Sequence, residues 1–174
     1  MSGGRRPVIG VMGASEPGPG TLEAAHRLGR LLAQAGWVVL TGGRPAGVME
    51  AACAGAKSVA GSLTVGVLPT GPDGPVSAQV DLAVFTALGE ARNAINVLSS
   101  DVVVACGVEG PGTASEVALA MKARRPTVLL GAAPAAVAFF QSMAAGQALH
   151  QAETPEAVIE IIEHQLRIPR WRAV

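Results

Sequence analysis

The residues best suited to chemistry lie in one glycine-rich stretch, Gly110-Pro111-Gly112-Thr113-Ala114-Ser115-Glu116. This stretch follows an apolar run at 102–105 and opens a helical pattern. Glycines let a phosphate approach the backbone closely, and the unpaired amides at the start of a helix supply positive potential. The Thr113 hydroxyl adds a further donor. The stretch therefore predicts a site for an anionic, nucleotide-like ligand.

Glu116 has two interpretations that the sequence leaves open. Thr113-Ala114-Ser115-Glu116 matches a capping box, in which Thr113 caps the helix and Glu116 folds back onto the Thr113 amide. Alternatively, Glu116 faces the ligand and acts as an acid, a base or an electrostatic stabiliser of an oxocarbenium ion developing at a sugar carbon. The glycine-rich approach favours a function, because an ordinary cap does not need it.

Three charged residues lie near this chemistry. Arg92 stands close to the start of a helical segment, where the macrodipole makes an exposed cation unfavourable by about 0.3–1 kcal/mol. An anion nearby would reverse that cost, whereas a solvated arginine is the alternative. Arg44, in a Gly/Pro loop, either covers a phosphate or faces water, and we assign it no role. The Glu109 carboxylate would repel a phosphate unless it points away or meets a ribose hydroxyl.

The elements that must position these residues alternate along the chain. Apolar, strand-like runs occur at 7–12, 37–40, 63–68, 81–85, 101–105 and 127–130, and helical patterns at 21–35, 47–60, 89–99, 113–123, 135–144 and 155–166. Continuous apolar strands alternating with helices indicate a parallel sheet covered on both faces. We expect a doubly wound α/β domain with a mostly parallel sheet of about six or seven strands.

Ligands of doubly wound sheets bind beyond the carboxyl ends of the strands. Gly-rich loops follow the first, second and fifth predicted strands, at 13–18, 41–47 and 107–112. The dinucleotide spacing G-x-G-x-x-G and the Lys-Ser or Lys-Thr of a P-loop are both absent, so we expect neither NAD nor FAD. We predict that the three loops form one site, whose ligand contacts are Gly13, Ala14, Ser15, Thr41, Gly42, Gly43, Arg92, Asn93, Gly110, Gly112 and Thr113.

Length and composition limit the classes of function. The 174 residues suit a single domain, 1–174, and the formal net charge of zero without a Lys/Arg run makes nucleic acid an unexpected partner. Cys53 and Cys106 lie in apolar surroundings and are expected to be small buried hydrophobes. His26, His150 and His164 are scattered, so no metal site is predicted.

Two apolar segments resemble targeting signals only superficially. The run at 7–12 after Arg5-Arg6 is too short for the apolar core of an export signal. The stretch 128–149 is interrupted by Gly131, Pro134 and Gly146, which makes it a poor membrane span. We expect a cytoplasmic protein without a membrane partner.

Several motifs occur in the order found in the Lonely Guy family, which is often labelled lysine decarboxylase. They are Gly42-Gly43-x-x-x-Gly47-Val48-Met49, Gly66-Val67-Leu68-Pro69, Arg92-Asn93 and the stretch from Gly110 to Glu116. The chain resembles this family over about 7–130. The resemblance implies a Rossmann-like fold and phosphoribohydrolase chemistry. By motif match, Arg92 and Glu116 correspond to the family's catalytic arginine and glutamate, and Gly110, Gly112 and Thr113 to its phosphate loop.

The chain is more similar to a bacterial branch of that family that includes molybdenum-cofactor carrier proteins. This similarity implies a homodimer whose loops hold a phosphate-bearing ligand. Two departures from the hydrolases weaken the catalytic prediction: Val108-Glu109-Gly110-Pro111 replaces their Pro-Gly-Gly, and the charged motif around the arginine is reduced to Glu90-Ala91-Arg92-Asn93. Ligand binding is therefore a firmer expectation than catalysis.

Three hypotheses follow. In the main one, the protein binds a nucleoside 5′-monophosphate or a pterin phosphate, such as an AMP-like nucleotide or molybdopterin, and requires no cofactor. In the second, Arg92 and Glu116 cleave the N-glycosidic bond of a nucleoside 5′-monophosphate. In the third, the protein is a molybdenum-cofactor carrier or a regulatory module without catalysis. An apolar stretch at 135–145 further suggests a homodimer.

Overall fold

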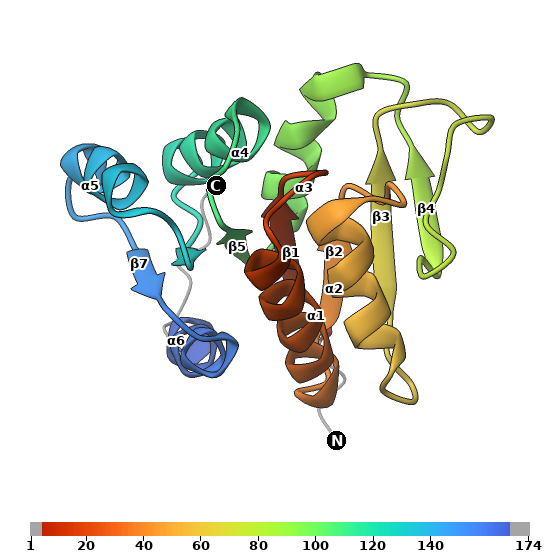
Figure 1. Ribbon diagram of the computed structural model, residues 1–174, viewed down its shortest axis with the longest axis horizontal. Coiled ribbons are helices and arrows are strands. Elements are labelled where there is room, and N and C mark those ends of the chain that lie inside the picture. Colours follow the sequence, from red (N-terminus) through yellow and green to blue (C-terminus); the bar gives the residue numbers. More distant parts are fainter. Residues whose placement is uncertain (1–4, 168–174) are drawn as a thin grey trace.

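The computed structural model describes residues 5–167. They form a seven-stranded sheet with helices, and the strand order is β4-β3-β2-β1-β5-β6-β7, with every neighbouring pair parallel (Figure 1). The strands are β1 (Val8–Gly13), β2 (Val38–Thr41), β3 (Thr64–Leu68), β4 (Leu82–Phe85), β5 (Val102–Cys106), β6 (Thr127–Leu130) and β7 (Leu149–Ala152). The helices are α1 (Pro19–Gln34), α2 (Gly47–Lys57), the short 3-10 helix η1 (Gly89–Arg92), α3 (Asn93–Ser99), α4 (Pro111–Lys122), α5 (Pro134–Met143) and α6 (Pro155–Arg167).

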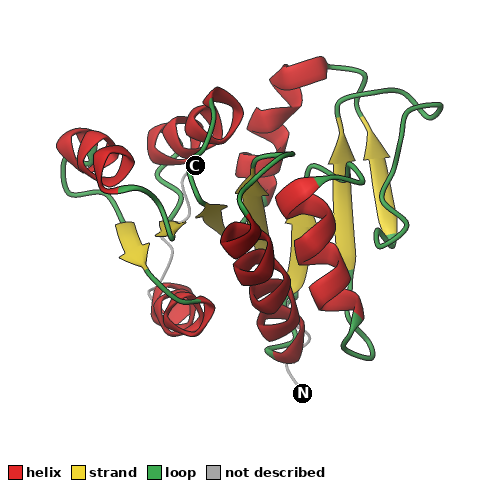
Figure 2. Ribbon diagram, in the orientation of Figure 1, coloured by secondary structure: helices red, strands yellow, loops and turns green. Residues whose placement is uncertain are grey.

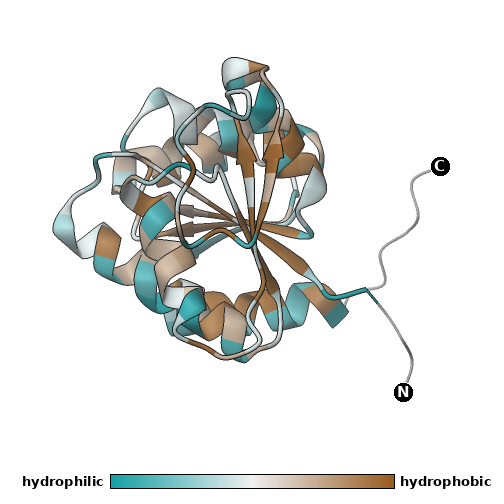
Figure 3. Ribbon diagram, turned by 90° about the vertical axis from the view of Figure 1, so that its right-hand side faces the viewer, coloured by the Kyte–Doolittle hydropathy of each residue, from teal (hydrophilic) through white to brown (hydrophobic). Residues whose placement is uncertain are grey.

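The central strands carry apolar side chains on both faces, which forces helices onto both sides of the sheet. Every residue of β2, β5 and β6 is buried. One apolar layer joins the sheet to α1, α2 and α6, and the other face packs on α3, α4 and α5. Figures 2 and 3 show the strands between these two layers. The predicted doubly wound α/β architecture is confirmed, and the sheet is parallel throughout.

The two edge strands depart from the central pattern. β7 was not predicted, because His150 and Gln151 interrupt its apolar residues and leave no continuous apolar run. β4 was predicted, but Leu82, Val84 and Phe85 lie 55%, 40% and 38% exposed on this edge. The expected helix at 89–99 is divided into η1 and α3. Within residues 5–167, no helix is long and apolar enough to cross a membrane.

The strand order creates a topological switch at the centre of the sheet. The chain proceeds from β1 outward to β4 on one side, and then returns to β5, which pairs with the other side of β1. Loops leaving β1 and β5 therefore diverge at the carboxyl edge, where doubly wound proteins bind ligands. Cys53, on α2, and Cys106, at the end of β5, are both buried and free, as expected of small apolar residues.

Helices α1 and α2 pack through glycines that permit backbone contact. A Cβ at Gly29 of α1 would stand 1.9 Å from the carbonyl oxygen of Ala52, and one at Gly55 of α2 would stand 1.8 Å from that of His26. Both distances are far below van der Waals contact with groups that cannot rotate away. The approach of these helices, and with it the layer that covers β1 and β2, depends on the two missing side chains.

We predict that Gly29→Ala lowers the free energy of unfolding by about 1–3 kcal/mol, because the added methyl group forces the two backbones apart. Gly20→Ala in the same helix is the matched control, since a Cβ there meets nothing within 4 Å. Urea denaturation of both variants measures the effect. Equal midpoints for Gly29→Ala and the wild type would contradict the close packing described here.

Candidate functional site

A cavity of about 320 Å³ opens at the carboxyl edge of the sheet, beside the switch between β1 and β5. Three Gly-rich loops contribute to it, together with η1, the start of α3 and the first turns of α4. The lining residues are Val11, Met12, Gly13, Ala14, Ser15, Gly42, Arg44, Met49, Glu90, Arg92, Asn93, Gly110, Pro111, Gly112, Thr113 and Glu116. Loops that are distant in the sequence thus share one hollow.

The beginning of α4 presents backbone donors to this cavity. Gly110 is the N-cap with an extended backbone, Pro111 begins the helix, and no side chain caps it. The amides of Gly112 and Thr113 belong to the first turn and lack partners within the helix. Thr113 lies inside the helix rather than at its cap, so the capping-box interpretation of this stretch is wrong. The unpaired amides and the macrodipole make the helix start suitable for an anion.

Glu116 lies one turn further along α4 and reaches the cavity. Its side chain is only 7% exposed, and its Oε1 accepts a hydrogen bond from Asn96 Nδ2 at 3.1 Å. Burial raises the pKa of Glu116 to about 6, although the Asn96 hydrogen bond and the positive charge of Arg92 oppose the rise. A carboxyl group of this kind exchanges a proton close to neutral pH, which suits either proton transfer or adjustment of the local charge.

Arg92 ends η1 with its side chain buried against the β2 loop. It is 4% exposed, and a Cβ at Gly42 would lie 2.4 Å from Nη1 and 2.8 Å from Nη2. The guanidinium therefore occupies the space that any side chain at position 42 would need. Burial lowers the pKa of Arg92, and the charges of Glu116 and Glu90 raise it. Arginine nevertheless stays protonated, so a positive charge is held at this wall.

Asn93 links the arginine wall to α4. Its Nδ2 lies 3.4 Å from Glu90 Oε2 and 3.3 Å from Ser115 Oγ, and the Ser115 hydroxyl donates to the carbonyl of Gly112 at 2.7 Å. These contacts connect η1 and α3 to the first turn of α4. The side chain of Asn93 thus helps fix the positions of the charged wall and the backbone donors relative to each other.

Glu109 turns away from the cavity. Its Oε1 accepts a hydrogen bond from Thr21 Oγ1 at 2.7 Å, and its Oε2 accepts one from the amide of Gly18 at 3.2 Å. The carboxylate thus occupies the N-terminus of α1, where the macrodipole favours it. The repulsion that a carboxylate beside a phosphate would cause is avoided, because Glu109 does not line the hollow.

The structure brings together most of the predicted site residues. The cavity is lined by Gly13, Ala14, Ser15, Gly42, Arg92, Asn93, Gly110, Gly112, Thr113 and Glu116. Thr41 and Gly43 are not among its lining. Thr41 Oγ1 accepts a hydrogen bond from the Gly43 amide at 3.1 Å, and Gly43 has a φ of 70°. These two residues shape the loop behind Gly42.

Sequence reasoning missed several members of the site. Met12, Met49 and Glu90 line the cavity, and Asn96 holds Glu116 from α3. The two methionines could not be predicted as site residues, since nothing in an apolar side chain distinguishes a cavity wall from the interior. Asn96 carried one usable signal, because an amide in an apolar helical segment requires a polar partner when it is buried. Among residues 5–167, no cluster of three or more His, Cys, Asp or Glu side chains suits a metal ion.

The fold and the site together define a Rossmann-like α/β domain with a polar cavity at the switch point of its sheet. A family model narrows this class: residues 6–159 match the SLOG cluster4 family, and the chain belongs to that family. The narrower resemblance to the Lonely Guy hydrolases stays a prediction.

Known proteins similar to this chain include two of known structure. The molybdenum cofactor binding protein of Rippkaea orientalis is 49% identical, with a TM-score of 0.88 over 93% of this chain and 98% of that one. The molybdenum cofactor carrier protein of Chlamydomonas reinhardtii is 47% identical, with a TM-score of 0.86 over 92% and 99%. An uncharacterized protein of Archaeoglobus fulgidus is 45% identical over 114 residues, which are 66% of this chain and 73% of that one.

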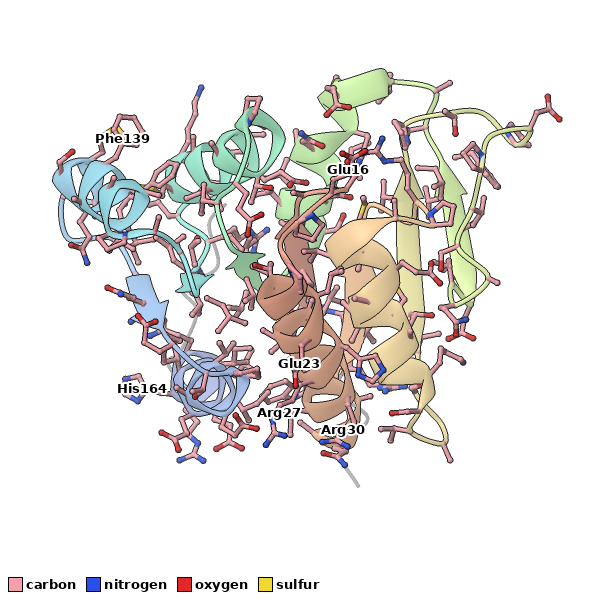
Figure 4. All side chains as sticks on the ribbon, in the orientation of Figure 1. Glu16, Glu23, Arg27, Arg30, Phe139 and His164 are labelled. Atoms are coloured by element: carbon pink, nitrogen blue, oxygen red, sulfur yellow. The ribbon has the colours of Figure 1, made fainter. Side chains whose placement is uncertain are left out.

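We predict that Glu116→Gln stabilises the protein at pH 7.5 by about 2 kcal/mol. The folded state raises the pKa of Glu116 from 4.5 to about 6, so its ionisation costs stability as the pH rises through this interval. The advantage of the glutamine should be complete above about pH 7 and vanish below about pH 4. Glu23→Gln, at an exposed position on α1 (Figure 4), controls for the lost charge. Denaturant titrations from pH 4 to 8 test this, and a pH-independent difference would refute it.

Proposed function

We propose that this protein is a carrier that binds the molybdenum cofactor, or its pterin phosphate, in the cavity at the carboxyl edge of the sheet. Two similar proteins of known structure are described as a molybdenum cofactor binding protein and a molybdenum cofactor carrier protein. A volume of about 320 Å³ is in the range of small-molecule sites. The cofactor is cargo in this proposal and takes part in no chemistry on the protein.

The observation that carries the proposal is the pairing of the α4 start with Arg92 in one hollow. The amides of Gly112 and Thr113 supply neutral donors with a favourable dipole, and the buried guanidinium supplies a full positive charge. We assign the ligand's phosphate to the α4 amides. The loops at Gly13–Ser15 and at Gly42 have little or no side chain to exclude the remainder of the ligand.

We predict that Gly112→Asp weakens binding of molybdopterin at least tenfold, because its carboxylate would compete with the phosphate for the amides of α4. The fold should tolerate the change, since a Cβ at Gly112 meets nothing within 4 Å and an acidic residue in the first turn favours the helix. Gly112→Ala adds the same Cβ without charge and should bind within about threefold of the wild type. Equilibrium dialysis with molybdopterin, and with AMP as a second phosphate ligand, measures both variants. Undiminished binding by Gly112→Asp would reject the phosphate position.

A second candidate function is supported by the joint position of Arg92 and Glu116. Both line the same cavity, and a carboxyl group with a pKa of about 6 is able to donate a proton to a leaving base. We propose hydrolysis of the N-glycosidic bond of a nucleoside 5′-monophosphate as this alternative. If it operates, AMP or a related nucleotide should release free base, detected by chromatography, and Glu116→Gln should lower the rate at least a hundredfold. Absence of free base from the whole nucleotide panel would leave the carrier function alone.

We also propose that the protein is a homodimer. The supporting observation is exposed apolar surface: on α5, Phe139 and Met143 are 60% and 45% exposed, and Figure 4 shows Phe139 directed away from the sheet. Covering such side chains in a second copy would remove them from water. Light scattering should give twice the mass of the chain, and a monomer mass across micromolar concentrations would contradict the assembly.

A further inference from the structure

The cavity holds a second arginine for which the proposed function has no use. Arg44, from the loop after β2, lines the same hollow as Arg92. The Nε atoms of both side chains are buried without a hydrogen-bond partner. Among residues 5–167, neither guanidinium has a carboxylate within the 4.0 Å of an ion pair, although exposed arginines elsewhere, such as Arg27, do form ion pairs.

Two carboxylates, Glu90 and Glu116, also line the cavity, but neither lies within ion-pair distance of Arg44 or Arg92. Burial lowers the pKa of Arg92, the charges of Glu116 and Glu90 raise it, and the charge of Arg44 lowers it, so the two cations repel each other. Glu116 directs its Oε1 to Asn96, and the exposed Glu90 meets Asn93. Confining two like charges to one wall costs free energy, which a bound anion would offset. The arrangement therefore indicates a negatively charged group of the ligand at this wall.

The arginine wall and the α4 amides lie at different strand ends of the same cavity. The Arg92 guanidinium lies against Gly42, directly after β2, whereas α4 follows β5. Strand β1 separates β2 from β5 in the sheet. The carboxyl ends of β2 and β5 are thus about 10 Å apart, which is more than one phosphate spans. A ligand that extends from one strand end to the other is therefore able to meet the amides with one anionic group and the arginines with another.

We propose that the cavity contains two anion subsites, the amides of Gly112 and Thr113 and the pair Arg44 and Arg92, and that its ligand carries a phosphate at one end and a second anionic group at the other. This inference rests on the proposed function, which supplies the phosphate. The second group is a phosphate, a carboxylate or a metal oxyanion, because each matches the planar donors of a guanidinium. The arginine pair would select against otherwise similar ligands that end in a neutral group.

Matched sugar phosphates test the two subsites separately. Fructose 6-phosphate carries one anionic group, and fructose 1,6-bisphosphate adds a second at the opposite end of the same sugar. The wild type should bind the bisphosphate at least tenfold more tightly in isothermal titration. Arg44→Gln should remove most of that preference while leaving fructose 6-phosphate within about twofold. Arg30→Gln, an exposed position on α1 at the opposite end of that helix from Glu16 and the cavity loops (Figure 4), removes the same charge and should change neither affinity.

The outcomes separate this inference from the proposed function. If fructose 6-phosphate binds and the bisphosphate gains nothing, the two-subsite proposal fails and the phosphate site stands. If Arg44→Gln weakens both sugars equally, a single anion site explains the cavity and the proposal also fails. If neither sugar binds at about 10 mM but molybdopterin does, the two-subsite proposal fails and the carrier function stands. If molybdopterin does not bind either, the proposed function is overturned. Arg44 is only half-buried and forms no ion pair within residues 5–167, so the fold should tolerate its replacement. Thermal unfolding of each variant checks that a loss of binding is not caused by misfolding.

Discussion

A sheet whose strands all run in one direction imposes the main constraint on this molecule. Between two parallel strands the chain must run back over one face of the sheet as a helix or a long loop. The loops that follow the strands therefore all lie at the same edge of the sheet. The order around β1 then decides where these loops separate. Because β2 and β5 flank β1, the loops that follow these three strands are neighbours, and together they line the cavity. The position of the site thus follows from topology before any side chain is considered.

Within the cavity, desolvation controls the electrostatics. Arg92 and Glu116 are both more than nine-tenths buried, yet they form no ion pair, and Glu116 is hydrogen-bonded to the neutral Asn96 instead. In a medium less polar than water, unpaired charges interact more strongly with the charged groups of a bound ligand. The site therefore combines fixed backbone donors with charged side chains whose solvation has already been removed by folding.

Sequence patterns predicted the interior of the sheet well and its periphery poorly. The apolar runs placed β1 to β6 within about one residue. Most of these strands are buried on both faces, and the exposed edge strand β4 was found because its residues are apolar all the same. β7 escaped notice, since the polar residues of an edge strand resemble a loop. Glycine loops and Arg92 pointed to the correct edge, whereas Arg44 stayed undecided because the residues that line the cavity with it come from distant segments. The local pattern of Thr113 and Glu116 suggested a cap, but Pro111 lets the helix begin two residues earlier.

The contact between Glu109 and α1 has a consequence for how a ligand is received. The carboxylate immediately before Gly110 is held by Thr21 and by the Gly18 amide, and α1 packs tightly on α2 and also contacts α6. The segment that leads into α4 is thereby tethered to the helical layer on the opposite face of the sheet. Its conformational entropy is lost when the chain folds and not when a ligand arrives. Because the loop is already ordered, binding costs less conformational entropy, and the affinity for the ligand is higher.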